Sequence, residues 1–383
     1  MKDLYILSLH MAYGGLQKAV AEFANLMADH YQVHILSFYN MPSGSAYPID
    51  SRVEIHYLYD DIPNREEFRA ALAAWKPCSV LREGARAAKT LLAKRLLIIR
   101  AVRSISSGII VSTRDEYAVL LSRYGNKDVI KIAQFHEDHA FKKPLVKHFS
   151  RDYGNIDLFV LLSPKMVTEV REIMKANTHT RVEYIPNFIS VLPPEAPFEK
   201  KKKEVIAAGR LHHVKGFDRL IECFAQLHPE FSEWKLKIVG DGEEYRHLQE
   251  TIKSCKAEQY VELAGRYSSE EIETAMAEAS VYALSSYSEG FPFVLLEAMG
   301  GSLPIVACDT RGGLSMMVQH GKNGYLVHSM EQFRDALASL MRDDELRGKM
   351  ARASRASLME FSREAVGKQW VDLIEELCCD KEN

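Results

Sequence analysis

The chain has 383 residues, of which 47% are hydrophobic and 26% charged, as in an ordinary globular protein with more than one domain. Its fully apolar runs, such as Leu96–Ile99, fall far short of the roughly 20 residues that span a bilayer. Met1-Lys2-Asp3-Leu4 leads into a strand-like segment without a signal-peptide core, so we expect a cytoplasmic protein. The net charge of −3 divides unevenly between the halves of the chain. Residues 1–190 carry +5 and the rest −8, which favours an anionic partner for the first half.

The six cysteines are scattered along the sequence. They form no Cys-x-x-Cys pair and have no histidine at ligand spacing. We therefore expect reduced thiols, and neither a disulfide framework nor a cysteine-based zinc site.

Strand-like and helical segments alternate in the first half. A strand at Leu4–Leu9 precedes a glycine loop, a helix and a second strand at Val33–Phe38. This βαβ unit predicts a parallel sheet with right-handed crossovers. Further strands are expected at 108–112, 130–134, 158–162 and 182–185.

A second α/β series follows residues 190–203, which are rich in proline, glutamate and lysine and are interpreted as a solvated linker. Its strands are expected at 205–208, 236–239, 261–263, 281–284 and 304–307. The pattern predicts an α/β protein with two Rossmann-like, doubly wound parallel-sheet domains that face each other across a cleft. We place the N-terminal domain at 1–188, with a returning C-terminal helix at 364–383, and the C-terminal domain at 189–363.

Two cations, Arg210 and Lys215, follow the first strand of the second series, within residues 209–216. Fixed cations at the carboxyl edge of a sheet, beside glycines that allow close backbone approach, suit a diphosphate. A solvated loop with incidental charge explains this stretch alone about equally well.

Two carboxylates, Glu289 and Glu297, lie within residues 288–299, where we expect a helix to begin at Pro292. Eight residues of helix rotate by about 800°, so the carboxylates do not share a face and are not expected to be a paired acid and base. Each is expected to accept hydrogen bonds from different hydroxyls, while the helix start faces an anion.

In this order and spacing the motifs resemble the retaining glycosyltransferase family 4. Gly209-Arg210 and Lys215-Gly216, followed by Glu289 and Glu297 in Glu-x7-Glu spacing, carry the resemblance. It covers nearly the whole chain and includes Gly14-Gly15, 185–187, 238–242, Gly265 and 323–327. The resemblance implies a GT-B fold and a hexosyltransferase that uses a nucleotide sugar, UDP-linked in preference to GDP-linked. It implies a saccharide or lipid-linked acceptor in cell-surface polysaccharide or teichoic-acid biosynthesis.

The resemblance also assigns roles to residues. In the second domain it gives Arg210 and Lys215 to the donor diphosphate, Glu297 to the ribose hydroxyls, and Glu289, with the amides of Gly290 and Phe291, to the transferred sugar. The catalytic set it implies is His136, Glu289, Arg210 and Lys215.

First-domain residues complete the pattern that the family implies. Gly14 and Gly15 are expected to approach the donor phosphates, and His136, just after a strand, to face the donor sugar. His136 is alternatively one member of a histidine cluster with His139 and His148.

Two motifs depart from the family pattern: Met316 stands where a Glu is usual, and Gln17-Lys18 stands where many relatives have Glu-Arg. The family implies retention of configuration without a metal or other cofactor, and the chain has no Asp-x-Asp sequence. The leaving diphosphate would be stabilised by cations and helix N-termini, and front-face attack is the route we favour.

Other functions remain open at this stage. A sugar phosphorylase or synthase of the same fold is one, and a non-catalytic, glycosyltransferase-like partner subunit is another. A nicotinamide dehydrogenase is disfavoured because residues 8–18 lack Gly-x-Gly-x-x-Gly. No nucleic-acid partner is expected.

A basic amphipathic helix is expected at residues 81–105. Five of its cations fall within roughly a 100° arc, namely Arg82, Arg86, Lys89, Arg100 and Arg103. Such a helix suits the anionic inner face of a membrane, although packing of its apolar stripe on the domain core explains it equally well. A second basic group comprises Lys142, Lys143, Lys147 and Arg151.

Overall fold

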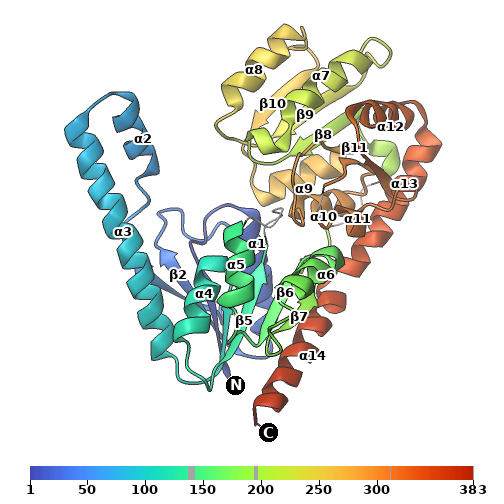
Figure 1. Cartoon of the computed structure of the whole chain (residues 1–383). Helices are drawn as coiled ribbons and strands as arrows, with labels where there is room; N and C mark the ends of the chain where they lie inside the picture. Colours follow the sequence, from blue (N-terminus) through green and yellow to red (C-terminus); the bar gives the residue numbers. More distant parts are fainter. Residues whose placement is uncertain (137–142, 194–196, 311, 383) are drawn as a thin grey trace. The chain divides into compact units, whose positions relative to one another are not determined.

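The computed structural model describes residues 1–136, 143–193, 197–310 and 312–382 (Figure 1). These residues form two compact units, one of residues 1–136, 143–185 and 369–382, the other of residues 186–368. Each unit is built on a parallel sheet with helices packed against it, so the predicted α/β class with two Rossmann-like sheets is confirmed. The domain boundaries at 188/189 and 363/364 stay a prediction.

The first unit contains a seven-stranded sheet in the order β3-β2-β1-β4-β5-β6-β7, and the paired strands are parallel. Its strands are β1 (Asp3–Ser8), β2 (Gln32–Tyr39), β3 (Glu54–Tyr59), β4 (Ile109–Ser112), β5 (Ile130–Phe135), β6 (Leu158–Leu161) and β7 (Arg181–Tyr184). All but β3 coincide with strands predicted from the sequence.

The helices of this unit are α1 (Gly15–Met27), α2 (Arg65–Ala73), α3 (Pro77–Ser104), α4 (Asp115–Tyr124), α5 (Lys143–Arg151) and α6 (Pro164–Ile173). Local sequence explains where several begin. Ser163 accepts a hydrogen bond from the Met166 amide at 3.2 Å and Pro164 starts α6, a capped N-terminus with proline in the first turn. Side chains such as Ile98, Ile110 and Phe159 form the core between sheet and helices.

The second unit contains a six-stranded parallel sheet in the order β10-β9-β8-β11-β12-β13. Its strands are β8 (Glu204–Ala208), β9 (Lys235–Val239), β10 (Val261–Gly265), β11 (Val281–Leu284), β12 (Ile305–Cys308) and β13 (Gly324–Val327). Five were expected; β13 was noted as a motif and not as a strand.

Helices on this sheet are α7 (Phe217–Leu227), α8 (Tyr245–Ser254), α9 (Ser269–Glu278), α10 (Phe293–Gly300), α11 (Leu314–Met317), α12 (Met330–Arg342) and α13 (Asp344–Ser357). Short 3-10 turns lie at η1 (Phe198–Lys200), η2 (His213–Lys215) and η3 (Leu358–Phe361). A reciprocal capping box between Ser268 and Glu271 starts α9. The core is apolar throughout and includes Leu220, Leu236 and Phe333.

The last helix, α14 (Arg363–Glu382), begins in the second unit and belongs to the first from Gln369 onward (Figure 1). Trp370 packs against Phe23 of α1 with ring centroids 4.8 Å apart. Glu376 pairs with Arg181 at 2.7 Å, and Lys381 donates a hydrogen bond to the carbonyl of Val129 at 2.8 Å. From Gln369 onward the C-terminal helix is therefore an integral part of the first unit.

The interpretation of residues 190–203 as a solvated linker is wrong at Lys201. Its ammonium donates hydrogen bonds to the carbonyls of Ala277, Ala279 and Gly301 at 2.7–3.0 Å, and burial lowers its pKa to about 8. Lys201 thus ties the segment to the second unit. Residues 194–196 of the same segment lie outside the described residues.

All six cysteines are free thiols, as expected. Among the helices that the structure describes, none has the length and apolarity needed to cross a bilayer.

Candidate functional site

The topology of the second unit marks one place on its sheet. The chain passes from β8 to β9 on one side, whereas β11 pairs with β8 on the other, so the strand order reverses between β8 and β11. Ligands of doubly wound sheets bind outside the carboxyl ends of the strands at such a reversal. The loops that leave β8 and β11 there are residues 209–216 and 285–292, which carry the cations and the first carboxylate singled out in the sequence.

Lys215 and Glu289, from these two loops, form an ion pair. The Nζ of Lys215 lies 2.6 Å from the Oε1 of Glu289. The carboxylate is buried, with 9% of its side chain exposed, and it also accepts a hydrogen bond from the hydroxyl of Ser286 at 2.5 Å. A buried carboxylate needs such partners to stay ionised at low cost, so the pair fixes one cation and one anion at the reversal point.

Hydrogen bonds join residues 214–216 of the first loop to residues 285–287 of the second. The hydroxyl of Ser285 donates to the carbonyls of Gly216 at 2.8 Å and Lys215 at 3.0 Å, and the amide of Tyr287 donates to Val214 at 2.8 Å. Gly216 has φ +60°, and a Cβ there would lie 2.5 Å from the carbonyl oxygen of Ser285, so only glycine fits. The position of Lys215 is therefore set by the second loop as well as by its own.

A third segment, after β12, contacts the backbone of Glu289 and Gly290 through residues 310, 312 and 313. A Cβ on Gly312 would lie 1.9 Å from the carbonyl oxygen of Glu289, and the amide of Gly313 donates to Gly290 at 2.6 Å. Thr310 donates its hydroxyl to the carbonyl of Glu289 at 3.3 Å. The backbone around the carboxylate is thus held on both sides.

Other predicted residues belong to the same two loops or to the helix that follows the second loop. Arg210 is exposed, and the described part of the chain offers it no ion-pair partner. The amides of Gly290 and Phe291 donate to no acceptor within the described residues, and they directly precede α10. Glu297 lies half-buried on α10, eight residues beyond Glu289. The structure brings Lys215, Glu289 and Gly290 together and leaves Arg210 pointing to solvent.

The predicted residues of the first unit lie at the carboxyl ends of its strands. Its sheet reverses between β1 and β4, and the loop after β1 contains Gly14 and Gly15. Gly15 starts α1, and the amide of Gly14 donates to the Tyr47 hydroxyl at 3.3 Å. No cap side chain stands at this helix start.

His136 directly follows β5. Its Nε2 lies 3.0 Å from the Oε1 of Gln134, so this nitrogen carries the proton and donates it. The Nδ1 is then a buried acceptor without a partner in the described residues. Burial lowers the pKa of His136 to about 4, so the ring is neutral near pH 7 and offers a lone pair. His139 lies outside the described residues, and His148 instead pairs with Asp115 at 2.6 Å.

Residues 190–357 match the sequence model of the glycosyl transferases group 1. This segment therefore resembles that family. It contains both loops of the candidate site and nearly all of the second unit.

Relatives of known name agree with this family. An exopolysaccharide phosphotransferase of Streptomyces coelicolor is 27% identical over 98% of this chain and 41% of its own length. A Campylobacter jejuni N-acetyl-D-galactosaminyltransferase, named for an undecaprenol-linked GalNAc acceptor, is 23% identical over 95% of this chain and 96% of its own. The chain spans only 41% to 61% of the length of three curated relatives that it matches.

Solved structures share the fold. A mutant of S. aureus TarM in complex with fondaparinux, α-GlcNAc-glycerol and UDP superposes with a TM-score of 0.77 at 14% identity, over 97% of this chain and 99% of that one. The fold is therefore GT-B, as the sequence predicted.

The structure corrects two expectations, one in the second unit and one in the first. Helix α10 begins at Phe293, with Pro292 as its N-cap, one residue later than predicted. In α3, Arg86 pairs with Asp61 and with Glu83, and Arg82 pairs with Glu83 at 2.9 Å, so the basic arc is partly neutralised. Of the second basic group, Lys142 lies outside the described residues.

The sequence reasoning missed His10 in the loop after β1. Burial, together with the charge of Arg114, lowers the pKa of His10, and its Nδ1 is buried without a partner in the described residues. Arg114 follows β4, so the two residues flank the reversal point of the first sheet. Their position after neighbouring strands was the available signal.

Proposed function

We propose that the chain is a retaining hexosyltransferase of glycosyltransferase family 4. It moves a hexose from a nucleotide sugar, most simply UDP-linked, to a saccharide or lipid-linked acceptor in cell-surface glycan biosynthesis. The second unit binds the donor and the first serves the acceptor, and the transfer itself uses no metal or other cofactor. The observation that carries the proposal is the Lys215–Glu289 pair, 2.6 Å apart and set at the strand reversal between β8 and β11.

The donor diphosphate suits the positive side of this site. The ion pair with Glu289 fixes the ammonium of Lys215, and Arg210, in the same loop, is exposed. The amides of Gly290 and Phe291 precede α10, where the helix dipole also favours an anion. These groups stabilise the charge that develops on the leaving diphosphate.

Transfer then proceeds on one face of the sugar. The acceptor oxygen forms the new bond to the anomeric carbon as the bond to the diphosphate oxygen breaks, and that oxygen takes the acceptor's proton. Glu289 and Glu297 accept hydrogen bonds from sugar and ribose hydroxyls, and the Nδ1 of His136 is an acceptor of the same kind. For Gly14 and Gly15 we retain contact with the donor phosphates as part of the proposal.

The names of similar proteins support this substrate class. The Campylobacter jejuni relative is named for an undecaprenol-linked acceptor and the TarM complex contains UDP. The acceptor in that name and the UDP in that complex are properties of those two proteins, and here they guide the choice of substrates to test.

The test is nucleotide release by the full chain with a panel of UDP- and GDP-sugars, with and without undecaprenol-linked or soluble acceptors. We expect acceptor-dependent release of UDP and an α-linked product from an α-linked donor. Arg210→Ala should lower kcat/KM by at least about tenfold, because it removes a charge-assisted contact to the leaving group. Arg246→Ala, an exposed arginine of α8 in the same unit, should leave it unchanged. Formation of a sugar phosphate that depends on orthophosphate would favour a phosphorylase, and no turnover at all a partner subunit.

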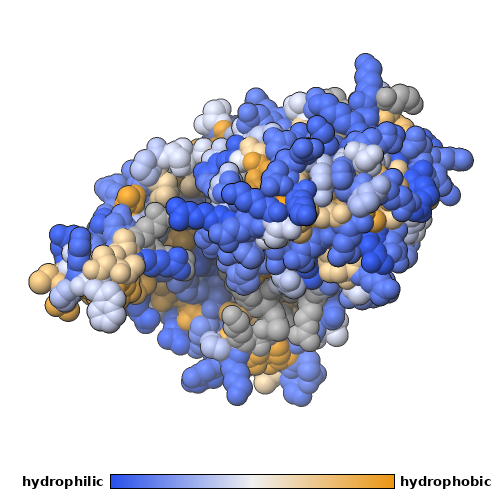
Figure 2. All heavy atoms as spheres, turned by 90° about the horizontal axis from the view of Figure 1, so that it is seen from above, coloured by the Kyte–Doolittle hydropathy of each residue, from blue (hydrophilic) through white to orange (hydrophobic). Residues whose placement is uncertain are grey.

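We also propose that the helical pair α2–α3 attaches the protein to an anionic membrane surface. Large apolar side chains are exposed along this pair, namely Leu72, Trp75, Leu81, Leu91, Leu92 and Leu96. Trp75, at the turn between the helices, is 92% exposed. At the left of Figure 2, where α2 and α3 lie in Figure 1, hydrophobic and hydrophilic side chains alternate on the surface.

Charge on the pair suits anionic lipid. Lys89, Arg95 and Arg100 are exposed on α3. Each such cation contributes on the order of 1 kcal/mol near an anionic leaflet, and a large aromatic side chain suits the interface. The surface can therefore bind reversibly without a spanning helix.

Liposome co-sedimentation tests this attachment. Lys89→Glu/Arg100→Glu should bind anionic vesicles at least about tenfold more weakly than the unmodified protein. Lys127→Glu/Lys165→Glu, which reverses two exposed charges elsewhere in the same unit, should bind like it. Binding must weaken with salt, since exposed charges are screened beyond about 8 Å at physiological ionic strength. Equal sedimentation of both variants would refute the attachment.

A further inference from the structure

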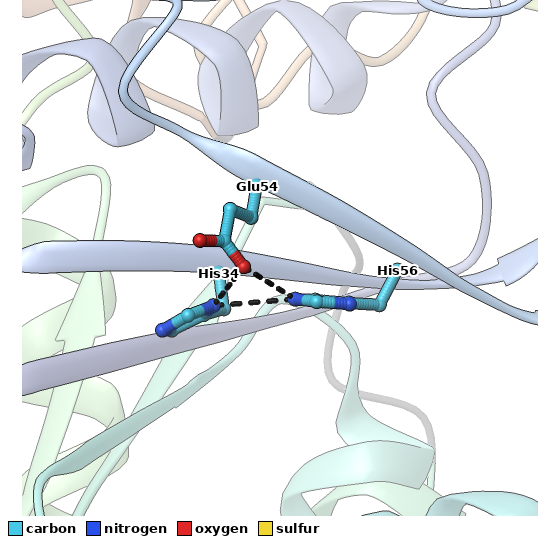
Figure 3. Close-up of side chains that lie close together, drawn as sticks. All are labelled: His34, Glu54 and His56. Atoms are coloured by element: carbon cyan, nitrogen blue, oxygen red, sulfur yellow. Dashed lines mark hydrogen bonds and ion pairs between the residues drawn. The ribbon is translucent and has the colours of Figure 1, made fainter.

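Two histidines and a glutamate meet on neighbouring strands of the first unit, away from the loops discussed above. His34 lies on β2, and Glu54 and His56 lie on β3, two residues apart and therefore on the same face. The parallel register pairs His34 with Glu54. Figure 3 shows the rings of His34 and His56 pointing at each other with the carboxylate over the gap between them.

The three facing atoms form a nearly equilateral triangle. The Nδ1 of His34 lies 3.2 Å from the Nε2 of His56 and 3.3 Å from the Oε2 of Glu54. The third side, from the Nε2 of His56 to the same Oε2, is 3.4 Å. One oxygen and two ring nitrogens, one from each residue, thus lie within 3.4 Å of one another.

These distances are those of a hydrogen bond and two ion pairs, and they also suit one metal geometry better than another. In a tetrahedral zinc site the ligands lie at about 2.0–2.1 Å, so neighbouring ligand atoms are about 3.3–3.4 Å apart. An octahedral ion with the same bond lengths would require about 2.8–3.0 Å. The measured 3.2–3.4 Å fit the tetrahedral case. Imidazole with carboxylate is also a ligand set that zinc accepts.

Surrounding groups orient two of the three ligands. The Nε2 of Gln32 donates to the other carboxylate oxygen of Glu54 at 3.4 Å, which leaves Oε2 directed at the histidines. The Nε2 of His34 faces the carboxylate of Asp3 at 3.7 Å, and Tyr5 stacks on the ring with centroids 4.8 Å apart. A carboxylate behind a ligating histidine fixes its tautomer and raises its basicity.

We propose that His34, Glu54 and His56 bind one Zn²⁺, with water in the fourth position. The site lies near the amino-terminal ends of β2 and β3, whereas the candidate glycosyl-transfer residues of this unit follow the carboxyl ends of their strands. Its role is structural: the ion clamps β3, the edge strand, to β2. As an edge strand, β3 is hydrogen-bonded to β2 alone, so ligation of the ion by Glu54 and His56 adds to the bonds that hold β3 on the sheet.

Zn²⁺ binding at this site has two measurable consequences, one for thermal stability and one for the absorption spectrum of bound Co²⁺. Histidines accept the metal only as neutral rings, and a bound ion stabilises the folded state in proportion to its free concentration. At Zn²⁺ a hundredfold above the dissociation constant, the Tm of the first unit should rise by about 5–10 °C. Tetrahedral Co²⁺ in the same site absorbs far more strongly in the visible range than octahedral Co²⁺.

The experiment uses the full chain, stripped with EDTA, desalted and titrated with Zn²⁺ against a chromogenic chelator. We expect one equivalent to bind, and His56→Gln and Glu54→Gln to weaken binding by roughly a hundredfold each and to abolish the Tm rise. Both positions are exposed at the sheet edge, so both variants should fold. His30→Gln, an exposed histidine of the same unit, is the matched control and should bind as tightly as the unmodified chain. The site is refuted if the unmodified chain binds no more tightly than His56→Gln, if His30→Gln weakens binding equally, or if Co²⁺ gives only an octahedral spectrum.

Discussion

Replacing Lys215 by Met separates its two roles, support of Glu289 and binding of the diphosphate. Methionine keeps most of the aliphatic length and removes the ammonium. Within the described residues, the Glu289 carboxylate then retains the hydrogen bond from Ser286 at 2.5 Å, in surroundings that expose 9% of its side chain. Removing one partner of a fully buried ion pair costs 3–5 kcal/mol. Because 22% of the Lys215 side chain is exposed and water can replace part of the contact, we expect about 2 kcal/mol and a fall in Tm of about 4–8 °C.

A double-mutant cycle measures the two roles independently. Glu289→Gln in the Lys215→Met background removes the uncompensated charge, and the amide still accepts from Ser286, so the double variant should recover most of the lost stability. UDP affinity, measured by calorimetry, should stay at least about tenfold reduced in both variants that lack the ammonium. Lys235→Met, which alters an exposed lysine of β9 in the same unit, is the control.

Either of two results would refute this reasoning. If the stability losses of the single variants simply add, Lys215 and Glu289 are not coupled. If the double variant binds UDP normally, the ammonium is not a diphosphate ligand and Lys215 only supports Glu289.

Three further predictions follow from the same structure. Glycosyl transfer should survive EDTA, since cations and amides take the place of a metal at the leaving group. The same treatment should lower the Tm of the first unit by removing Zn²⁺. Complete loss of transfer activity that Mg²⁺ or Mn²⁺ restores would contradict this. Burial lowers the pKa of His136 to about 4 from 6.5, so its contribution to the free energy of unfolding is complete above pH 6.5 and is lost as the pH falls toward 4. His136→Gln should reduce this loss of stability at low pH by at most about 3 kcal/mol, measured by urea titration at several pH values. An unchanged pH dependence of stability would mean that His136 is exposed to solvent. Trp370→Ala should destabilise the first unit by about 3–5 kcal/mol, because the ring is 4% exposed and packs on Phe23; a loss under 1 kcal/mol would mean that α14 adds little.

Sequence periodicity was sufficient for most of the fold because buried parallel strands are short apolar runs between helices. It failed at β3, an edge strand whose Glu54, His56 and Tyr57 are exposed. Because polar and apolar residues are mixed in β3, its sequence lacks the continuous apolar run that marks the buried strands. It also missed β13, where Tyr325 and Leu326 are only partly buried.

The candidate site was predictable as a set of residues and not as an arrangement. Motif spacing pointed to Lys215 and Glu289 separately, yet their ion pair spans 74 residues and depends on β8 and β11 being neighbours. Lys201 was assigned to solvent for the same reason, since its three carbonyl partners lie at the C-terminal ends of α9 and α10, far away in the sequence. The zinc ligands became visible only once the register of β2 and β3 was known.

The central claim is that the loops after β8 and β11 hold the donor diphosphate. A crystal structure of the chain soaked with UDP tests it most directly. We predict density for the diphosphate within hydrogen-bond distance of the Arg210 guanidinium, the Lys215 ammonium and the amide of Gly290 or Phe291, without a metal ion between them. Diphosphate density elsewhere on the protein, or a divalent ion bridging it to carboxylates, would contradict the account.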